Sequence, residues 1–181
     1  MADLSHARRE PFLATSPGVR PLRPAARWIL RGGPKVRLAA EGALKLAVPA
    51  AACRAAAAGD TAALWLGPDE WLLISGEHAA DETAAGLRTA LAGLPHSLVD
   101  VSHRQVALEV SGPDAPLLLA AGCPLDLERG AFPVGMCTRT MLAKAEIVLW
   151  RTGADVFRVE VWRSFAPYVS AFLREAARGV S

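Results

Sequence analysis

Hydrophobic and polar positions follow two different periods along the chain from residue 26 onward. Short apolar runs at 26–30, 64–66 and 71–74 carry no 3.6-residue stripe and lie next to Gly, Pro or Ser, so they predict strands. Residues 67–70, Gly-Pro-Asp-Glu, separate the last two runs, and proline followed by aspartate is typical of a turn that reverses the chain. We therefore expect these two runs to pair, with both carboxylates of 67–70 at an exposed turn.

Strict alternation is clearest in the second half of the chain. Residues 104–110, 145–151 and 155–163 each place apolar side chains at every second position, which is the pattern of half-buried strands. A turn at 152–154, Thr-Gly-Ala, joins the last two. Residues 52–57 give a weaker strand prediction, because their alanines favour helix whereas the flanking proline and glycine are typical of a hairpin.

Two helices are predicted in the first half of the chain. Proline at position 34 suits the first turn of a helix that we expect to run to about residue 46. Leucines at 87, 91 and 94 are spaced like one face of a second helix, from about 80 to 94. Strands and helices therefore alternate, which indicates a mixed α+β chain.

Two further helices are predicted in the second half. Residues 116–122 form a short apolar run that ends at a glycine, and Ser111 lies near the expected N-cap. The last helix follows Ser164, a second expected N-cap. Three residues of this last helix fall along one stripe that we assign to the core: Tyr168, Phe172 and Ala176.

The charge of the chain is uneven. The 181 residues carry a net charge of +2, but residues 1–37 contain eight basic and two acidic residues, and the remainder contains twelve basic and sixteen acidic residues. Because the start is also rich in proline, we expect residues 1–24 to form an extended basic arm. It lacks dense basic runs with interleaved aromatics, so we expect no nucleic acid and favour an acidic protein surface as its partner.

Neither a membrane span nor a metal site is predicted. No apolar run approaches the ~18 residues needed to cross a bilayer, and residues 1–10 have no apolar signal core, so we expect a cytoplasmic protein with no membrane partner. Cys53, Cys123 and Cys137 are odd in number and form no C-x-x-C pair, which favours free, buried thiols. The four histidines show no zinc-ligand spacing.

Asp100, Ser102 and His103 are the best catalytic candidates in the sequence. A serine nucleophile needs a histidine base and an acid joined in a series of hydrogen bonds. We expect these three residues to lie in one strand, where 100 and 102 share a face and 103 points to the opposite face, so they cannot bond in series. No Walker lysine loop and no G-x-G-x-x-G run is present. We therefore predict no catalytic, cofactor-binding or metal residues in this chain.

Five runs of sequence resemble, in order, the gamma subunits of heterotetrameric sarcosine oxidase over about residues 25–175. They are WLGPDEWLLI, VDVSHR, CPLDL, CTRTMLAKAEIVLWR and FRVEVWRSFAPYV. The resemblance implies a fold like the folate-binding region of the glycine-cleavage T-protein, a duplicated α+β arrangement of antiparallel sheets with helices against them. We therefore expect residues 25–181 to form one domain of two similar halves, 25–96 and 97–181.

The resemblance also implies a function. In that family, alpha, beta, gamma and delta subunits form a complex that oxidatively demethylates sarcosine to glycine, with hydrogen peroxide and 5,10-methylenetetrahydrofolate as further products. FAD, FMN, NAD, tetrahydrofolate and zinc belong to the other subunits, so no cofactor is expected in this chain. Gamma is an accessory subunit held chiefly by alpha. The alternative hypothesis is a stand-alone, tetrahydrofolate-binding aminomethyltransferase-like protein.

One strand bears on that alternative. T-proteins carry a Gly-Phe-Glu run on a late strand, whose glutamate helps to bind the pterin. The register that matches Phe157 places Val156 at the glycine and Arg158 at the glutamate. A guanidinium has donors only, so it cannot accept hydrogen bonds from the pterin N–H groups. Glu160 lies on the same face two residues later and stays open as a replacement.

A partner surface is predicted on the last strands. Trp162 shares a strand face with Arg158 and Glu160, opposite the apolar face of 157–161 that we assign to the core. Tryptophan and arginine concentrate at the centres of protein interfaces. The surface expected to contact the alpha subunit includes Arg139, Lys144, Arg151, Trp162 and Arg163. The alternative is that these cations lie on solvated sheet edges and that the tryptophans are core residues.

Overall fold

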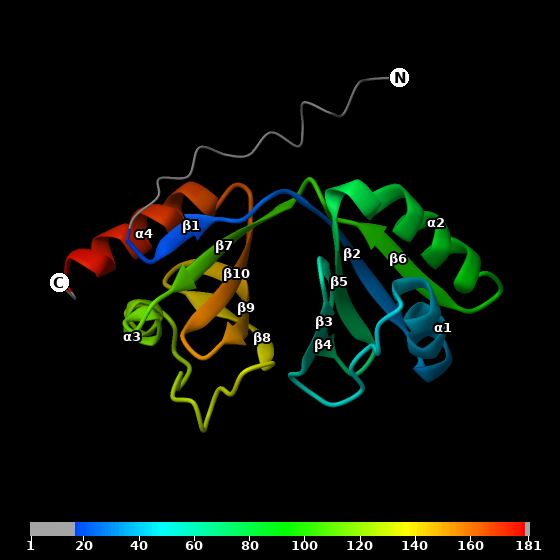
Figure 1. Cartoon of the computed structure of the whole chain (residues 1–181), viewed down its shortest axis with the longest axis horizontal. Coiled ribbons are helices and arrows are strands. Elements are labelled where there is room, and N and C mark those ends of the chain that lie inside the picture. The colour runs from blue at the N-terminus through cyan, green and yellow to red at the C-terminus, as the bar shows by residue number, and fades with distance from the viewer. Residues whose placement is uncertain (1–16, 180–181) are drawn as a thin grey trace, which may run out of the picture. The chain divides into compact units, whose positions relative to one another are not determined.

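The computed structural model describes residues 17–179 and divides the chain into two compact units. The N-terminal unit consists of residues 25–102, and the C-terminal unit consists of residues 17–24 and 103–179. Each unit contains one five-stranded antiparallel sheet and two α-helices (Figure 1). The predicted α+β fold with a duplicated sheet-plus-helix arrangement is confirmed.

The N-terminal sheet has the strand order β3-β4-β5-β2-β6. Its elements in chain order are β2 (Ala25–Gly32), α1 (Pro34–Leu44), β3 (Ala55–Ala58), β4 (Thr61–Gly67), β5 (Glu70–Gly76), the 3-10 helix η2 (Glu77–Ala79), α2 (Ala80–Ala90) and β6 (His96–Asp100). Figure 1 shows α1 and α2 side by side on one side of this sheet, and their apolar residues join the tryptophans of β2 and β5 in one core. This arrangement buries the amphipathic stripes of both helices.

The C-terminal sheet has the strand order β1-β7-β10-β9-β8. Its elements are β1 (Val19–Pro21), β7 (Gln105–Ser111), α3 (Ala115–Ala120), β8 (Cys137–Leu142), β9 (Ala145–Gly153), β10 (Val156–Trp162) and α4 (Ala166–Arg178). One face of the sheet packs with α3 and α4 around a core that includes Leu108, Phe157 and Leu173. The opposite face is called the outer face below.

The two sheets are equivalent in strand order. Taken from one edge they are β3-β4-β5-β2-β6 and β8-β9-β10-β7-β1. In the N-terminal unit, the edge position next to β2 is occupied by β6, which follows α2 in the chain. In the C-terminal unit, the equivalent edge position next to β7 is occupied by β1, the first strand of that sheet in the chain. Val19–Pro21 therefore complete a sheet as β1, and the prediction of an extended arm over 1–24 is wrong for these residues. Residues 1–16 of that arm lie outside the described residues.

The boundary between the units also differs from the predicted halves. It falls between Ser102 and His103, six residues after the expected break at 96. The reason is the pairing of β6 with β2, because Leu98 lies opposite Leu30 and packs against the core of the N-terminal unit. A strand at 96–100 alone carries no local signal that assigns it to one sheet or the other.

Most predicted elements are present, with shifted ends. Helix α1 ends at Leu44, where Lys45 takes the left-handed conformation, and α2 ends at Ala90 rather than near 94. The weak strand expected at 52–57 is found three residues later as β3. The N-caps of α3 and α4 are Asp114 and Phe165. The predictions of Ser111 and Ser164 at these caps are therefore wrong.

The turn between β4 and β5 reverses the chain as predicted, but its two carboxylates differ. Asp69 is exposed, whereas Glu70 is buried and begins β5. Arg31 Nη2, on β2, donates a 2.6 Å hydrogen bond to Glu70 Oε2. This hydrogen bond, and after it the charge of Glu70, raises the pKa of Arg31. The prediction of an exposed turn is wrong for Glu70, which ties two strands together.

Candidate functional site

Strand β10 separates the core of the C-terminal unit from its outer face. Three of its side chains belong to the buried apolar core, namely Phe157, Val159 and Val161. The side chains between them lie on the outer face, namely Arg158, Glu160 and Trp162. The prediction that Trp162 points away from the core face is confirmed.

Trp162 belongs to a row of outer-face residues at one end of the sheet. It pairs with Gln105 on β7. On the other side, Val161 of β10 pairs with Ile147 of β9, so the adjacent position in the sheet places Trp162 opposite Glu146. Glu146 pairs in turn with Met141 on β8. We call Gln105, Trp162, Glu146 and Met141 the end row. Both Trp162 and Met141 are exposed, so the row presents apolar surface to solvent.

The side chain of Trp162 is held from one side by an arginine. The guanidinium carbon of Arg104 lies 5.1 Å from the centroid of the Trp162 ring, within the range of a cation–π interaction. Phe165 N donates a 2.8 Å hydrogen bond to Trp162 O, which closes a turn that leads into α4. Arg163 N donates to Arg104 O at 2.8 Å, which ties this turn to the start of β7.

The other predicted contact residues lie mostly at the same end of the sheet. Lys144 is exposed in the turn between β8 and β9, directly before the strand that carries Glu146. Arg139 is exposed on β8, one outer-face position away from Met141. Arg163 is half-buried directly after Trp162. The fold thus brings four of the five predicted residues to one region of the C-terminal unit.

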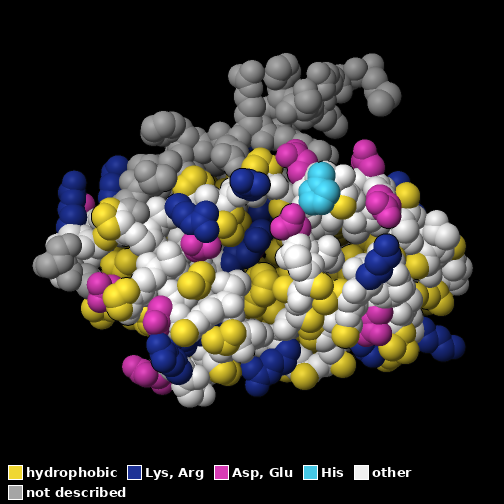
Figure 2. Space-filling model, in the orientation of Figure 1, with side chains coloured by type: hydrophobic (Ala, Val, Ile, Leu, Met, Phe, Trp, Pro, Cys, Tyr) yellow, Lys and Arg dark blue, Asp and Glu magenta, His cyan; other side chains and the backbone are white. Residues whose placement is uncertain are grey.

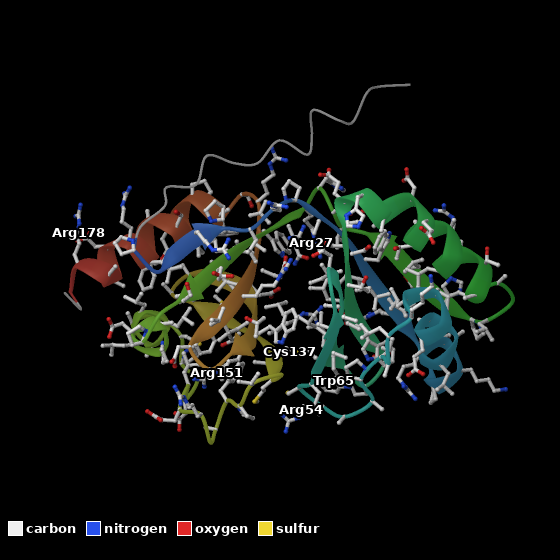
Figure 3. All side chains as sticks on the ribbon, in the orientation of Figure 1. Arg27, Arg54, Trp65, Cys137, Arg151 and Arg178 are labelled. Carbon is white, nitrogen blue, oxygen red and sulfur yellow. The ribbon has the colours of Figure 1, made fainter. Side chains whose placement is uncertain are left out.

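The fifth, Arg151, lies in the interior of that unit. Its side chain is 1% exposed and contacts three backbone carbonyls: Nη1 donates to Leu127 O and Phe132 O, and Nε and Nη2 donate to Ala154 O. The guanidinium carbon lies 4.8 Å from the Phe157 ring centroid. Figure 3 shows Arg151 beside the loop that follows α3. A side chain in this position is not available to a partner, so the prediction that Arg151 belongs to the partner surface is wrong.

The outer face also carries the two residues on which the prediction about folate depends. Arg158 Nε donates a 2.8 Å hydrogen bond to Glu160 Oε1, and Arg158 Nη2 lies 2.7 Å from the same oxygen without the alignment of a hydrogen bond. Glu160 is 0% exposed. Its carboxylate, which the sequence left open as a pterin acceptor, therefore has a cationic partner on its own strand.

Two aromatic residues that follow Trp162 in sequence are exposed, and the sequence analysis did not predict this for either of them. The buried stripe of α4 consists of Ala166, Val169, Ser170 and Leu173. Tyr168 lies off this stripe and is 39% exposed, so its assignment to the core is wrong, whereas Phe172 and Ala176 do pack against the core. Phe165 is exposed as well.

Exposed apolar residues occur singly elsewhere. On the face seen in Figure 2, apolar side chains are interspersed with basic and acidic ones. Scattered apolar residues are normal on protein surfaces and need no partner.

The candidate catalytic residues do not form a triad in the described structure. Strand β6 ends at Asp100, so the expectation of one strand through 103 is wrong. Asp100 Oδ1 accepts a hydrogen bond from Ser102 N, and Ser102 Oγ accepts one from Arg27 N. Through these hydrogen bonds, the side chains of Asp100 and Ser102 fix the backbone conformation directly after β6.

The cysteines follow the sequence analysis in part. None of the three cysteines is in a disulfide; Cys123 and Cys137 are buried as predicted, whereas Cys53 is half-buried. Among residues 17–179, no three His, Cys, Asp or Glu side chains cluster in a way that would hold a metal ion. Within the same residues, no helix has the length and apolar character required to span a membrane.

The sequence matches a known family and curated proteins. Residues 32–179 match the model of the sarcosine oxidase, gamma subunit family. A sarcosine oxidase subunit gamma of Corynebacterium sp. (strain P-1) is 43% identical over 116 residues, which cover 64% of this chain and 56% of the relative. One of Arthrobacter sp. is 46% identical over 105 residues, covering 58% and 51%. The chain thus spans about half the length of the curated relatives it matches.

Solved structures agree with the fold. A chain of the heterotetrameric sarcosine oxidase from Corynebacterium sp. U-96, solved in complex with pyrrole 2-carboxylate, superposes with a TM-score of 0.83 at 33% identity, covering 89% of this chain and 83% of that one. The glycine cleavage system aminomethyltransferase T from Bartonella henselae gives a TM-score of 0.68 at 15% identity, covering 89% and 46%, which shows a shared fold alone. With the family match over residues 32–179, the chain belongs to the sarcosine oxidase gamma subunit family.

Proposed function

We propose that this chain is the gamma subunit of a heterotetrameric sarcosine oxidase and that it supports assembly of the complex without an active site of its own. The family match over residues 32–179 carries the proposal. The similarity to a chain of a heterotetrameric sarcosine oxidase supports it. In this proposal the alpha subunit is the chief partner, the beta and delta subunits complete the complex, and the complex is cytoplasmic.

The complex would oxidatively demethylate sarcosine to glycine, with formation of hydrogen peroxide and 5,10-methylenetetrahydrofolate. FAD, FMN, NAD, tetrahydrofolate and zinc would be bound by the other subunits. The engaged carboxylate of Glu160 and the arginine at 158 favour this hypothesis over a stand-alone tetrahydrofolate-binding aminomethyltransferase-like protein. A pterin site needs an acceptor, whereas the guanidinium of Arg158 offers none and the carboxylate of Glu160 is buried with Oε1 already bonded to Arg158.

The contact surface proposed for the alpha subunit is the end of the C-terminal sheet that carries Trp162. It includes Arg139, Lys144 and Arg163 and excludes the buried Arg151. An exposed tryptophan that Arg104 stacks on and Arg163 follows combines large apolar contact area with directional polar groups, which is the usual composition of energetically important interface residues.

The test is co-expression of a tagged form of this full chain with the other three subunits. The proposal expects all four subunits to purify together and the complex to produce hydrogen peroxide from sarcosine, whereas the chain alone produces none. Recovery of this chain alone from the co-expression, or sarcosine oxidation by the isolated chain, would overturn the proposal.

A further inference from the structure

Strand β6 is an edge strand of the N-terminal sheet, and among residues 17–179 no strand pairs with its outer edge. Four of its five residues are exposed, and Val99 is 51% exposed. An exposed, unpaired edge is a template for a further strand, and proteins commonly protect such edges with charged side chains. In β6 the ionisable residues, His96 and Asp100, stand at the two ends, and the apolar residues lie between them.

The backbone groups that point to the outer edge belong to alternate residues of β6. Val101 N donates a 2.9 Å hydrogen bond to Arg27 O of β2, which fixes the alternation of the ladder between the two strands. Positions 97 and 99, an even number of residues away, share that direction and bond to β2. The N–H and C=O groups that point to the outer edge are therefore those of His96, Leu98 and Asp100.

The side chains of these same three residues share one face of the sheet. Leu98 packs against the core of the N-terminal unit, so His96 and Asp100 lie beside it on the helix-covered face and are exposed at the edge. His96 Nδ1 lies 2.7 Å from Leu94 O, which can only accept, so Nδ1 is the donor. When the ring is charged, Nε2 is a donor as well. Asp100 accepts from Ser102 N through Oδ1, and Oδ2 is the oxygen that can meet this donor.

We propose that β6 pairs with β6 of a second copy of this chain, antiparallel and centred on Leu98, which joins two five-stranded sheets into one sheet of ten strands. This register places His96 opposite Asp100 of the second copy, and two-fold symmetry makes the same pair a second time. It places Leu98 opposite its own equivalent and covers the exposed Val99. The residues that face each other are also those with outward backbone groups, so the ladder hydrogen bonds form in the same register.

Charge complementarity selects the second copy as the occupant and selects the register. Opposite charges directly across a ladder stabilise it, whereas like charges destabilise it. If the pairing is centred on Val99 instead, Asp100 faces Leu98 and both ionic pairs are lost. The other three edge strands, β1, β3 and β8, contain no acidic residue, so none of them can make such pairs with its own copy.

The experiment measures the dimer dissociation constant of the full-length chain by sedimentation equilibrium, at about pH 6, where an ordinary histidine is largely protonated. His96→Glu places two carboxylates opposite each other at both pairs and should weaken the dimer about tenfold or more. His96→Glu/Asp100→Lys restores opposite charges with the signs exchanged and should recover most of the affinity. His78→Glu makes the same substitution at an exposed histidine of η2 in the same unit and should change nothing.

Amide hydrogen exchange, measured by NMR, locates the contact in the wild-type chain without any substitution. The amides of His96, Leu98 and Asp100 should exchange about tenfold more slowly at concentrations at which the dimer prevails than in dilute solution. The amides at 97 and 99 already bond to β2 and should change much less. Circular dichroism melts check that each variant in the sedimentation series stays folded.

The outcomes are distinct from those of the proposed function, because this inference concerns the chain on its own. A wild-type chain that stays monomeric at its highest soluble concentration overturns the inference. A folded His96→Glu variant that dimerises like the wild type, or a folded double variant no tighter than His96→Glu, also overturns it. If exchange at 96–100 slows only when the other three subunits are added, the edge binds one of those subunits; the dimer is then wrong and the proposed function stands.

Discussion

Arg158 Nε and Glu160 Oε1 lie 2.8 Å apart on one face of β10, two residues from each other along the strand. In the register that matches Phe157, Arg158 of this pair occupies the place where a T-protein would present a glutamate to the pterin. A carboxylate that is 0% exposed and bonded to a guanidinium has to exchange that partner before it can accept from a ligand. The pair therefore works against pterin recognition at this strand.

We predict that tetrahydrofolate binds this chain weakly or not at all. The physical reason is the loss of the acceptor at Arg158 and the engagement of Glu160. Isothermal titration calorimetry under anaerobic conditions measures this directly, with an authentic T-protein as the positive control. A micromolar dissociation constant for the isolated chain would contradict the prediction and would favour the alternative hypothesis of a folate-binding protein.

The ion pair should also be needed for stability. Arg158→Met leaves the buried carboxylate of Glu160 with less compensation, and the free energy of unfolding should fall by about 3–5 kcal/mol. The double variant Arg158→Met/Glu160→Leu removes both charges and should recover most of that loss. Urea denaturation measures both, with Arg174→Met as the exposed control. Equal stability of the wild type and Arg158→Met would show that the pair contributes nothing.

Arg151 should behave as a core residue of the C-terminal unit. Arg151→Met leaves the carbonyls of Leu127, Phe132 and Ala154 without their donor, which should lower the free energy of unfolding by about 3 kcal/mol or more. Arg151→Lys should lower the free energy of unfolding by less than Arg151→Met does, but it should not keep the wild-type value, because an ammonium group cannot reproduce the planar fork of a guanidinium. Chemical denaturation is the measurement, and a loss below about 0.5 kcal/mol, as for an ordinary surface substitution, would contradict this role.

The isolated chain is predicted to be colourless and free of metal. Its sequence has no flavin, dinucleotide or zinc motif. An absorption spectrum and elemental analysis of the purified chain are the measurements. A flavin band or stoichiometric zinc would place a cofactor in this subunit and contradict the assignment of all cofactors to its partners.

Local patterns predicted the elements well because each element has its own period. The alternation in 155–163 gave the strand, its core face and its outer face, and the structure confirms all three. The place of β1 could not be predicted in the same way. Three residues, Val-Arg-Pro, carry no period, and their pairing with β7 bridges about ninety residues of chain. The pairing of so short a strand depends on contacts with distant parts of the chain, which the local sequence does not show.

The site was predicted in part, and Arg151 shows where the reasoning failed. Arg151 lies two residues after Leu149 and four after Ile147, both of them core residues. The alternating pattern of the strand therefore places Arg151 on the core face. The general expectation that arginine is exposed overrode that signal. Arg104 could not have been identified from its neighbours in sequence, because the residue that orients it is Trp162, on another strand.

Trp162 is the residue that should matter most for assembly. It is exposed, it lies between Gln105 and Glu146 in the end row, and Arg104 holds one side of its ring. Trp162→Ala should weaken binding to the alpha subunit by about 2 kcal/mol or more, roughly thirtyfold, while the free energy of unfolding changes little. Leu117→Ala removes an exposed apolar side chain from α3 in the same unit and is the matched control. Co-expression with the other subunits, followed by affinity measurement on the purified variant, makes the comparison. A folded Trp162→Ala variant that assembles with wild-type affinity would remove Trp162 from the interface, and equal losses for both variants would show that any exposed apolar residue has the same effect.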